Sequence, residues 1–109
     1  MEWVVITLDG EIDLSRVEEI DVIFQSQRPL PGTGLIIDLS PVTFMDSSGI
    51  GLLMRAEQHL LNNGSWLTLV IPKGPARRLI EVAGLADRWP SYPTLHMAIE
   101  SCNGKLRSA

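Results

Sequence analysis

The segment Asp46-Ser47-Ser48-Gly49-Ile50-Gly51 holds the side chains of this chain whose types and spacing best suit chemistry. One carboxylate and two hydroxyls stand where an apolar stretch ends and a helical pattern begins. Asp and Ser are favoured helix N-caps because their oxygens accept hydrogen bonds from unpaired N–H groups of the first turn. A cap does not account for Gly49 and Gly51, since each glycine costs a helix interior about 0.5–1 kcal/mol relative to alanine. We therefore predict a cap that is also a docking surface, where bare backbone lets another molecule approach closely.

A serine between a strand and a helix is also the position of a hydrolase nucleophile. The residues around Ser47 do not match the G-x-S-x-G pattern of that turn. A nucleophilic serine needs a base, but His59 lies roughly three helical turns away and His96 is distant in sequence. The phosphate-loop pattern and the dinucleotide fingerprint are absent from the sequence. We therefore predict that the chain is not an enzyme and binds no cofactor.

The metal-binding residue types are sparse in this chain. His59 and His96 are the only histidines, and neither has a cysteine or carboxylate at the spacing of a ligand pair. Cys102 is the only cysteine, which excludes an intrachain disulfide and suits a reducing compartment. The sequence therefore predicts no metal site.

The composition is typical of a globular domain, with 45% apolar and 20% charged residues among 109. The formal net charge of −4 argues against nucleic acid as a direct partner, because proteins that follow phosphates carry an excess of lysine and arginine. No signal-peptide pattern is present, and the apolar runs fall short of the roughly 20 residues of a membrane span. We expect a cytoplasmic protein without a membrane span.

Strands and helices alternate along most of the chain. Strands are predicted where β-branched, aromatic and other apolar residues concentrate, at 3–8, 11–12, 34–39 and 65–71. Helices are predicted where apolar residues recur at helical spacing, at about 17–24, 47–62, 75–83 and 94–101. Asn63-Gly64 and Gly84-Leu85 are residue pairs that end helices. The turn at Asp9-Gly10 predicts that the first two strands form a hairpin.

This alternation predicts an α/β fold with a mixed, mostly parallel sheet of four to five strands and about four helices. We expect one domain over residues 1–109, with an ordered core at about 3–101 and a polar C-terminal tail. The apolar run 34–39 lacks strict alternation, as is typical of a central strand covered on both faces. A first strand at an exposed edge would also allow a weak homodimer.

Three local expectations concern the predicted helices and the loop before residue 46. Phe44-Met45 is expected in that loop as an exposed apolar pair. Glu57 lies in the apolar arc of the second helix, for which the pattern gives no reason. On the third helix, one inward side is expected to hold Ala76, Leu79, Val82 and Ala83.

The segment from Val42 to Leu53, V-T-F-M-D-S-S-G-I-G-L-L, closely resembles the signature of anti-sigma factor antagonists. These are single-domain bacterial members of the STAS family. Gly10-Glu11-Ile12-Asp13 is similar to the family's G-E-[LI]-D, and Pro75-Ala76-Arg77-Arg78-Leu79-Ile80 resembles its third-helix region. The predicted elements match the family's order from about residue 3 to residue 101. The resemblance implies a STAS-like fold for nearly the whole chain.

The resemblance also implies a regulatory binding function. In the family, the unphosphorylated antagonist binds an anti-sigma factor and so frees a sigma factor for transcription. The anti-sigma factor is often a serine kinase that inactivates the antagonist, and a phosphatase restores it. The family's phosphoacceptor falls on Ser47. The partner-binding residues that we predict are Asp13, Asp46, Ser47, Ser48, Gly49 and Gly51.

Individual roles follow from this assignment. Asp46 is expected to shape the loop and contact the kinase, and Ser48 to help cap the helix. Gly49 and Gly51 are expected to permit close approach. For Asp13, which the resemblance places near the same edge, two interpretations stay open: a cap of the first helix or a partner contact.

A phosphoserine at a helix N-terminus carries about −1.5 to −2 charges and meets a favourable dipole, so the fold should tolerate it. Its bulk and charge would block a partner at the same surface. A loss of about 4 kcal/mol weakens binding roughly a thousandfold.

Two other functions share this fold: a non-catalytic STAS subunit of a membrane lipid-transport complex, and a component of a stress-signalling assembly. The doubled serine after Asp46 favours the antagonist.

Overall fold

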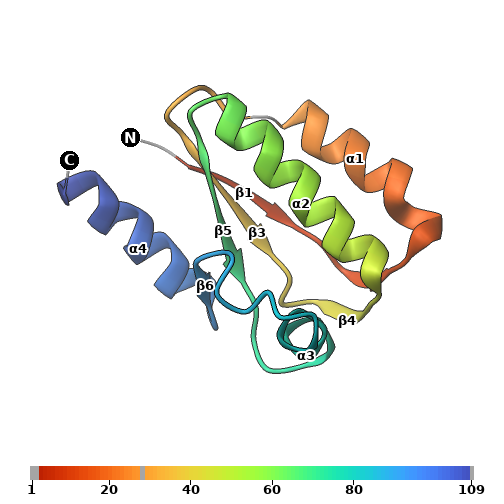
Figure 1. Ribbon diagram of the computed structural model, residues 1–109. Helices are drawn as coiled ribbons and strands as arrows, with labels where there is room; N and C mark the ends of the chain where they lie inside the picture. The colour runs from red at the N-terminus through yellow and green to blue at the C-terminus, as the bar shows by residue number, and fades with distance from the viewer. Residues whose placement is uncertain (1–2, 28, 109) are drawn as a thin grey trace.

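The computed structural model describes residues 3–27 and 29–108. Within these residues the chain forms six strands, four α-helices and one 3-10 helix, η1 (Figure 1). The elements in chain order are β1 (Trp3–Thr7), β2 (Gly10–Ile12), η1 (Leu14–Arg16), α1 (Val17–Ser26), β3 (Gly34–Asp38), β4 (Val42–Met45), α2 (Ser47–Asn62), β5 (Trp66–Val70), α3 (Pro75–Val82), β6 (Ser91–Tyr92) and α4 (Leu95–Ser108).

Four strands form the main sheet in the order β1-β3-β5-β6, and every pair in it is parallel. The helices α1 and α2 cover one face of this sheet and α4 covers the other (Figure 1). All five residues of β3 are buried, because that strand is central and covered on both faces. The predicted α/β architecture with a mostly parallel sheet is confirmed. β1 lies at the edge of the sheet, as a homodimer through that strand would require.

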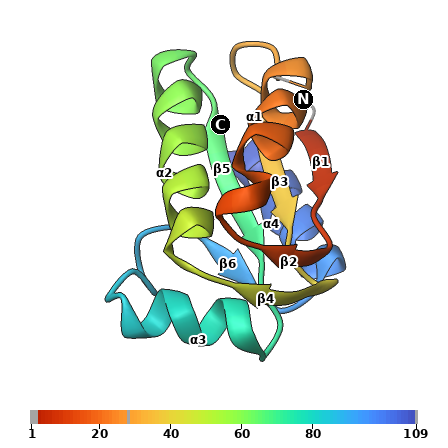
Figure 2. The ribbon, with the colours of Figure 1, turned by 90° about the vertical axis from the view of Figure 1, so that its right-hand side faces the viewer.

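The predicted hairpin between the first two strands is wrong. β1 pairs with β3, whereas β2 pairs in parallel with β4 in a separate two-stranded sheet (Figure 2). The turn before β2 carries the chain away from β1: Gly10 has a φ of 67°, and its N–H donates to the carbonyl of Pro41 at 3.2 Å. The chain therefore crosses towards β4 instead of folding back on β1.

The core on the α1 and α2 side holds most of the buried apolar residues, among them Ile20, Ile37, Leu52 and Leu69. A smaller cluster joins α4 to the opposite face through Ile36, Val70, Ala98 and Cys102.

Helix ends follow the local signals in two places. α2 spans Ser47–Asn62 as predicted, and Gly64 follows it with a φ of 71°. After α3, Gly84 has a φ of 77°, and the N–H of Leu85 donates to the carbonyl of Ile80 at 2.9 Å. Both predicted helix terminations are confirmed.

One expectation for the helices is wrong, and a second is right only in part. α4 continues to Ser108 instead of ending near residue 101, and Cys102, which is 1% exposed, packs in the cluster on the α4 side of the sheet just after the predicted end. On α3, Val82 is 80% exposed and Ala83 is also exposed. Ala76 is buried and Leu79 packs half-buried against the core, as expected, and Ile80 is buried as well, because these residues face the interior where α3 packs beside β4.

Glu57 is explained by an ion pair that is remote in sequence. Its Oε1 accepts hydrogen bonds from the Nη2 and Nε of Arg88 at 2.7 and 3.1 Å. The guanidinium of Arg88 also lies 5.8 Å from the ring centroid of Trp89. Within the described ranges, none of the helices has the length and apolar character needed to cross a membrane.

Candidate partner-binding site

The residues before the doubled serine form a strand, which corrects the expected loop. β4 pairs with β2, with Phe44 opposite Glu11 and Met45 opposite Ile12. Met45 is 5% exposed and Phe44 is 48% exposed. The expected exposed pair is therefore half right, because successive side chains of a strand point to opposite faces.

Asp46 is the N-cap of α2. Its backbone is extended, with φ −112° and ψ −170°, and its Oδ1 accepts a hydrogen bond from the N–H of Ser48 at 2.8 Å. Its carbonyl accepts from the N–H of Gly49 at 3.0 Å. The predicted helix cap is thus present, with Asp46 as the acceptor and Ser48 contributing a backbone donor.

The two serines differ in exposure. Ser47 is the first residue of α2 and is exposed, whereas Ser48 is half-buried. Among the hydrogen bonds of the described residues, the hydroxyl of Ser47 makes none. Ser47 therefore presents a solvent-accessible hydroxyl at the positive end of the helix dipole.

Gly49 has a reason within the molecule that the sequence interpretation missed. It is buried, and a Cβ placed on it would lie 2.4 Å from the Cγ and 2.6 Å from the Sδ of Met45. The same Cβ would lie 3.3 Å from the Cγ2 of Ile12. We therefore assign Gly49 to packing of α2 against β4 and β2, which explains the glycine within the molecule, and its expected contact with a partner stays a prediction.

Gly51 meets no such constraint. The nearest atom to a Cβ placed on it is the Nη1 of Arg55 at 3.7 Å, an ordinary van der Waals distance. Gly51 is half-buried on the first turn of α2. The two glycines therefore have different causes, and only the bare backbone of Gly51 is left without an internal explanation.

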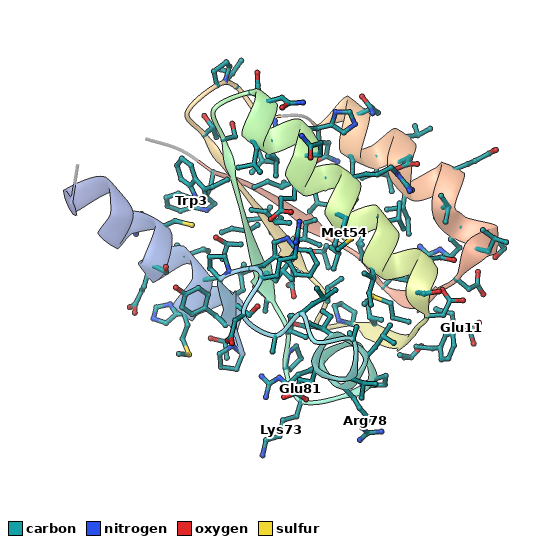
Figure 3. All side chains as sticks on the ribbon, in the orientation of Figure 1. Trp3, Glu11, Met54, Lys73, Arg78 and Glu81 are labelled. Atoms are coloured by element: carbon teal, nitrogen blue, oxygen red, sulfur yellow. The ribbon has the colours of Figure 1, made fainter. Side chains whose placement is uncertain are left out.

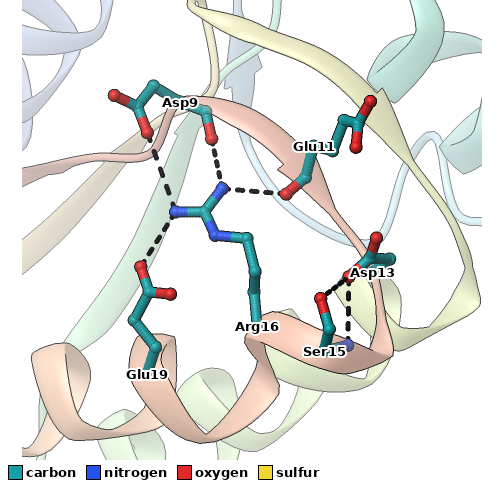
Figure 4. A network of polar contacts seen from close by, with 6 residues as sticks. All are labelled: Asp9, Glu11, Asp13, Ser15, Arg16 and Glu19. Carbon is teal, nitrogen blue, oxygen red and sulfur yellow. Dashed lines mark hydrogen bonds and ion pairs between the residues drawn. The ribbon is translucent and has the colours of Figure 1, made fainter.

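Asp13 forms a second cap beside the first. Its Oδ1 accepts hydrogen bonds from the N–H of Ser15 at 3.0 Å and from the Oγ of Ser15 at 2.5 Å (Figure 4). The N–H of Asp46 donates to the carbonyl of Ile12 at 3.1 Å, so the two caps are neighbours across the β2–β4 pair. Asp13 caps η1, the 3-10 helix that leads into α1, whereas the N-cap position of α1 itself is Arg16, which makes no side-chain cap hydrogen bond. The expected position of Asp13 beside residue 46 is observed, and its contact with a partner stays a prediction.

Arg16 holds the segment around the first cap in place. Its Nη1 donates to the carbonyls of Asp9 and Glu11 at 2.5 and 2.8 Å, and its Nη2 donates to Glu19 at 3.2 Å (Figure 4). The pKa of Arg16 is raised above its usual value, first by the hydrogen bond to Glu19 and further by the charges of Glu19, Asp9 and Asp13. The sequence analysis did not identify this role of Arg16. The only sequence feature that could have indicated it is the position of the arginine three residues after the capping Asp13.

The histidines lie away from the serines. His59 is an exposed residue near the C-terminal end of α2. His96 lies on α4, where its Nε2 is 3.0 Å from Glu100. In the part of the chain that the structure describes, no group of three or more histidine, cysteine, aspartate or glutamate residues is arranged to hold a metal ion.

Comparison with known proteins identifies the family. The model of the STAS domain family matches residues 2–98. An anti-sigma F factor antagonist of Lysinibacillus sphaericus is 33% identical, with 94% of this chain and 88% of that protein aligned.

Two solved structures are also similar. An anti-sigma factor antagonist from Mycobacterium paratuberculosis has a TM-score of 0.72 and 30% identity, covering 89% of this chain and 82% of its own. The anti-sigma factor antagonist SpoIIAA in its unphosphorylated form has a TM-score of 0.77 and 29% identity, covering 94% and 90%. On the family match and the sequence identity together, this chain belongs to the STAS domain family.

Proposed function

We propose that this chain is an anti-sigma factor antagonist whose binding to an anti-sigma factor is switched off by phosphorylation of Ser47. The relatives named as antagonists support the binding function. The single observation that carries the switch is the exposed, unbonded hydroxyl of Ser47 at the start of α2. A kinase can reach this group without unfolding any part of the site.

The geometry supports Ser47 as phosphoacceptor over Ser48. Ser48 is half-buried, and its N–H is bound to the cap carboxylate. A phosphate on Ser47 would stand beside the N–H groups and positive dipole of the α2 N-terminus, which stabilise anions. Since Gly49 and Met45 pack beneath the helix and not around Ser47, the modified protein should keep its fold.

The proposed contact surface consists of the two caps and the first turn of α2. It comprises Asp13, Asp46, Ser47, Ser48 and Gly51, with Gly49 beneath it as a packing residue. A phosphate adds about −1.5 to −2 charges beside Asp46. A partner that covers Ser47 would meet this bulk and charge directly, so we propose occlusion and not a change of fold as the mechanism.

The chain acts in this proposal as a binding protein and not as an enzyme. A serine nucleophile would need a base within hydrogen-bond reach. His59 is twelve residues beyond Ser47 on α2, which is about 18 Å along the helix axis. The proposed partners are an anti-sigma factor that is also a serine kinase, and a phosphatase that removes the phosphate.

The test uses the anti-sigma factor encoded in the same genome, purified with the full-length chain. Incubation with ATP followed by peptide mass spectrometry should locate phosphate on Ser47. Ser47→Ala should bind like the wild type in calorimetry and accept no phosphate, while Ser47→Asp should bind much more weakly. Ser48→Ala is the matched control and should still be phosphorylated. Phosphate on Ser48, or tight binding by Ser47→Asp, would contradict the switch.

A further inference from the structure

We propose that the groove between β4 and α3 is the second half of the docking surface, where it binds an apolar side chain of the anti-sigma factor with a carboxylate beside it. The inference rests on the proposed function and adds the chemistry that the partner must present. For brevity we call this site the β4–α3 groove. It is lined by Phe44, Met45, Pro75, Arg78, Leu79 and Val82.

The walls of the β4–α3 groove are apolar and accessible. The groove has a volume of about 320 Å³. Val82 is 80% exposed and Phe44 is 48% exposed, and they reach the groove from α3 and β4. Single exposed apolar side chains are common on proteins. Two of them that line one groove together with Pro75 and Leu79 make an apolar surface that a partner's aliphatic or aromatic side chain would cover favourably.

Arg78, the one charged residue that lines the groove, has a guanidinium without a partner among the described residues. Among the arginines whose side chains are described, Arg16, Arg55 and Arg88 form ion pairs, and Arg77 donates twice to the carbonyl of Ile71. The backbone N–H of Arg78 donates to the carbonyl of Gly74 at the start of α3, but its guanidinium makes no hydrogen bond or ion pair with the described residues. Its side chain extends from the side of α3 away from the sheet (Figure 3).

A free guanidinium at the edge of an apolar groove favours a partner with a carboxylate. Guanidinium groups bind carboxylates through paired hydrogen bonds, which are stronger than hydrogen bonds between neutral groups. Lys73, which lies just before α3, adds positive charge close to Arg78. Glu81 is the acidic residue on this side of α3 (Figure 3). A second copy of this chain, with a net charge of −4, is the competing occupant, and the tests below treat it as an outcome.

The β4–α3 groove is continuous with the phosphorylation site through Met45. Met45 lines the groove and lies two residues before Ser47 in the chain. The same side chain occupies the space beside Gly49, so the groove floor and the first turn of α2 form one packed unit. The shared position of Met45 therefore places the β4–α3 groove next to the start of α2, where a partner that covers Ser47 would bind.

The first experiment compares two exposed valines on different faces. Val82→Glu puts a charge in the β4–α3 groove, whereas Val22→Glu puts the same charge on α1, where Val22 is 65% exposed. Calorimetry with the anti-sigma factor should give a dissociation constant raised at least about tenfold for Val82→Glu, and little changed for Val22→Glu. Equal effects of the two substitutions, or none for Val82→Glu, would overturn the proposal.

The second experiment isolates the charge. Arg78→Glu should weaken binding about tenfold or more, and Arg78→Lys should retain most of it. Wild-type affinity should fall between about 0.05 M and 0.5 M salt, and Arg78→Ala should flatten that dependence. Unchanged affinity in Arg78→Glu would overturn the carboxylate assignment. Thermal unfolding of each variant checks that the fold is intact.

The outcomes separate this inference from the proposed function. Weak binding by Ser47→Asp together with normal binding by Val82→Glu and Arg78→Glu would support the proposed function and show that the β4–α3 groove is not part of the docking surface. Failure of the unmodified wild type to bind the anti-sigma factor would overturn both. Dimerisation of the free chain in sedimentation that Val82→Glu abolishes would assign the groove to a second copy and overturn the proposed occupant.

Discussion

The caps formed by Asp13 and Asp46 share one local hydrogen-bonding pattern but expose different side chains. In each, an aspartate ends a short strand and its Oδ1 accepts the N–H of the serine two residues later: Ser15 for Asp13 and Ser48 for Asp46. The residue between aspartate and serine is exposed in both, Leu14 in the first cap and Ser47 in the second. The same aspartate-to-backbone hydrogen bond therefore presents an apolar side chain at the cap of η1 and a hydroxyl at the cap of α2.

The caps also differ in what anchors them. Three residues after Asp13 stands Arg16, which binds the carbonyls of Asp9 and Glu11 at the surface. Three residues after Asp46 stands Gly49, whose missing side chain lets α2 pack on Met45. Polar contacts hold the first cap and close packing holds the second. The comparison shows that Ser47, the proposed phosphorylation site, lies at the cap that is held by packing. A phosphate on Ser47 should therefore leave the start of α2 intact.

The largest expected effect separates the middle residues of the two caps. Ser47→Asp should weaken binding to the anti-sigma factor roughly a thousandfold, about 4 kcal/mol, because the charge lies at the centre of the proposed contact. Leu14→Asp puts the same charge on the neighbouring cap and should cost tenfold or less. Calorimetry on both variants measures the difference. Comparable losses of affinity in the two variants would mean that the partner contacts both caps equally.

The next effect concerns the two glycines of α2. Gly49→Ala should lower the free energy of unfolding by about 1–3 kcal/mol, because the new Cβ collides with buried Met45. Gly51→Ala should raise that free energy by up to about 1 kcal/mol through helix propensity, since its Cβ meets no close atom. Urea unfolding distinguishes the two. A destabilising Gly51→Ala would show that our account of its surroundings is wrong.

The smallest expected effect tests whether the two capping aspartates contribute equally to the stability of the fold. Asp46→Ala and Asp13→Ala should each cost about 1 kcal/mol of stability by removing one side-chain acceptor from a helix start. Asp46→Asn keeps the acceptor and serves as the control, with little loss expected. Thermal unfolding of the three variants provides the measurement. A much larger loss for one aspartate would indicate a further structural role for it.

Much of the fold could be predicted from short-range pattern. The apolar run of β3, the bounds of α2 and the glycines after α2 and α3 follow from hydrophobic periodicity and helix-end chemistry, which depend on neighbouring residues. The cap formed by Asp46 is of the same kind. The exposed first position of α2, which Ser47 occupies, followed from that cap.

What the tertiary structure decided depends on residues distant in sequence. The pairing of β2 with β4 placed Asp13 beside Asp46 and refuted the hairpin. Only packing against Met45 revealed why Gly49 is a glycine, and only the position of Arg88 explained Glu57.

The sequence by itself therefore determined the order of the four α-helices and of most strands, the cap and the serine at its exposed position. The tertiary structure decided why residue 49 is a glycine, and it formed the groove where the guanidinium of Arg78 has no partner among the described residues. The physical reason is range: caps and helical faces form between residues a few positions apart, whereas packing space and free charge depend on every element that surrounds them.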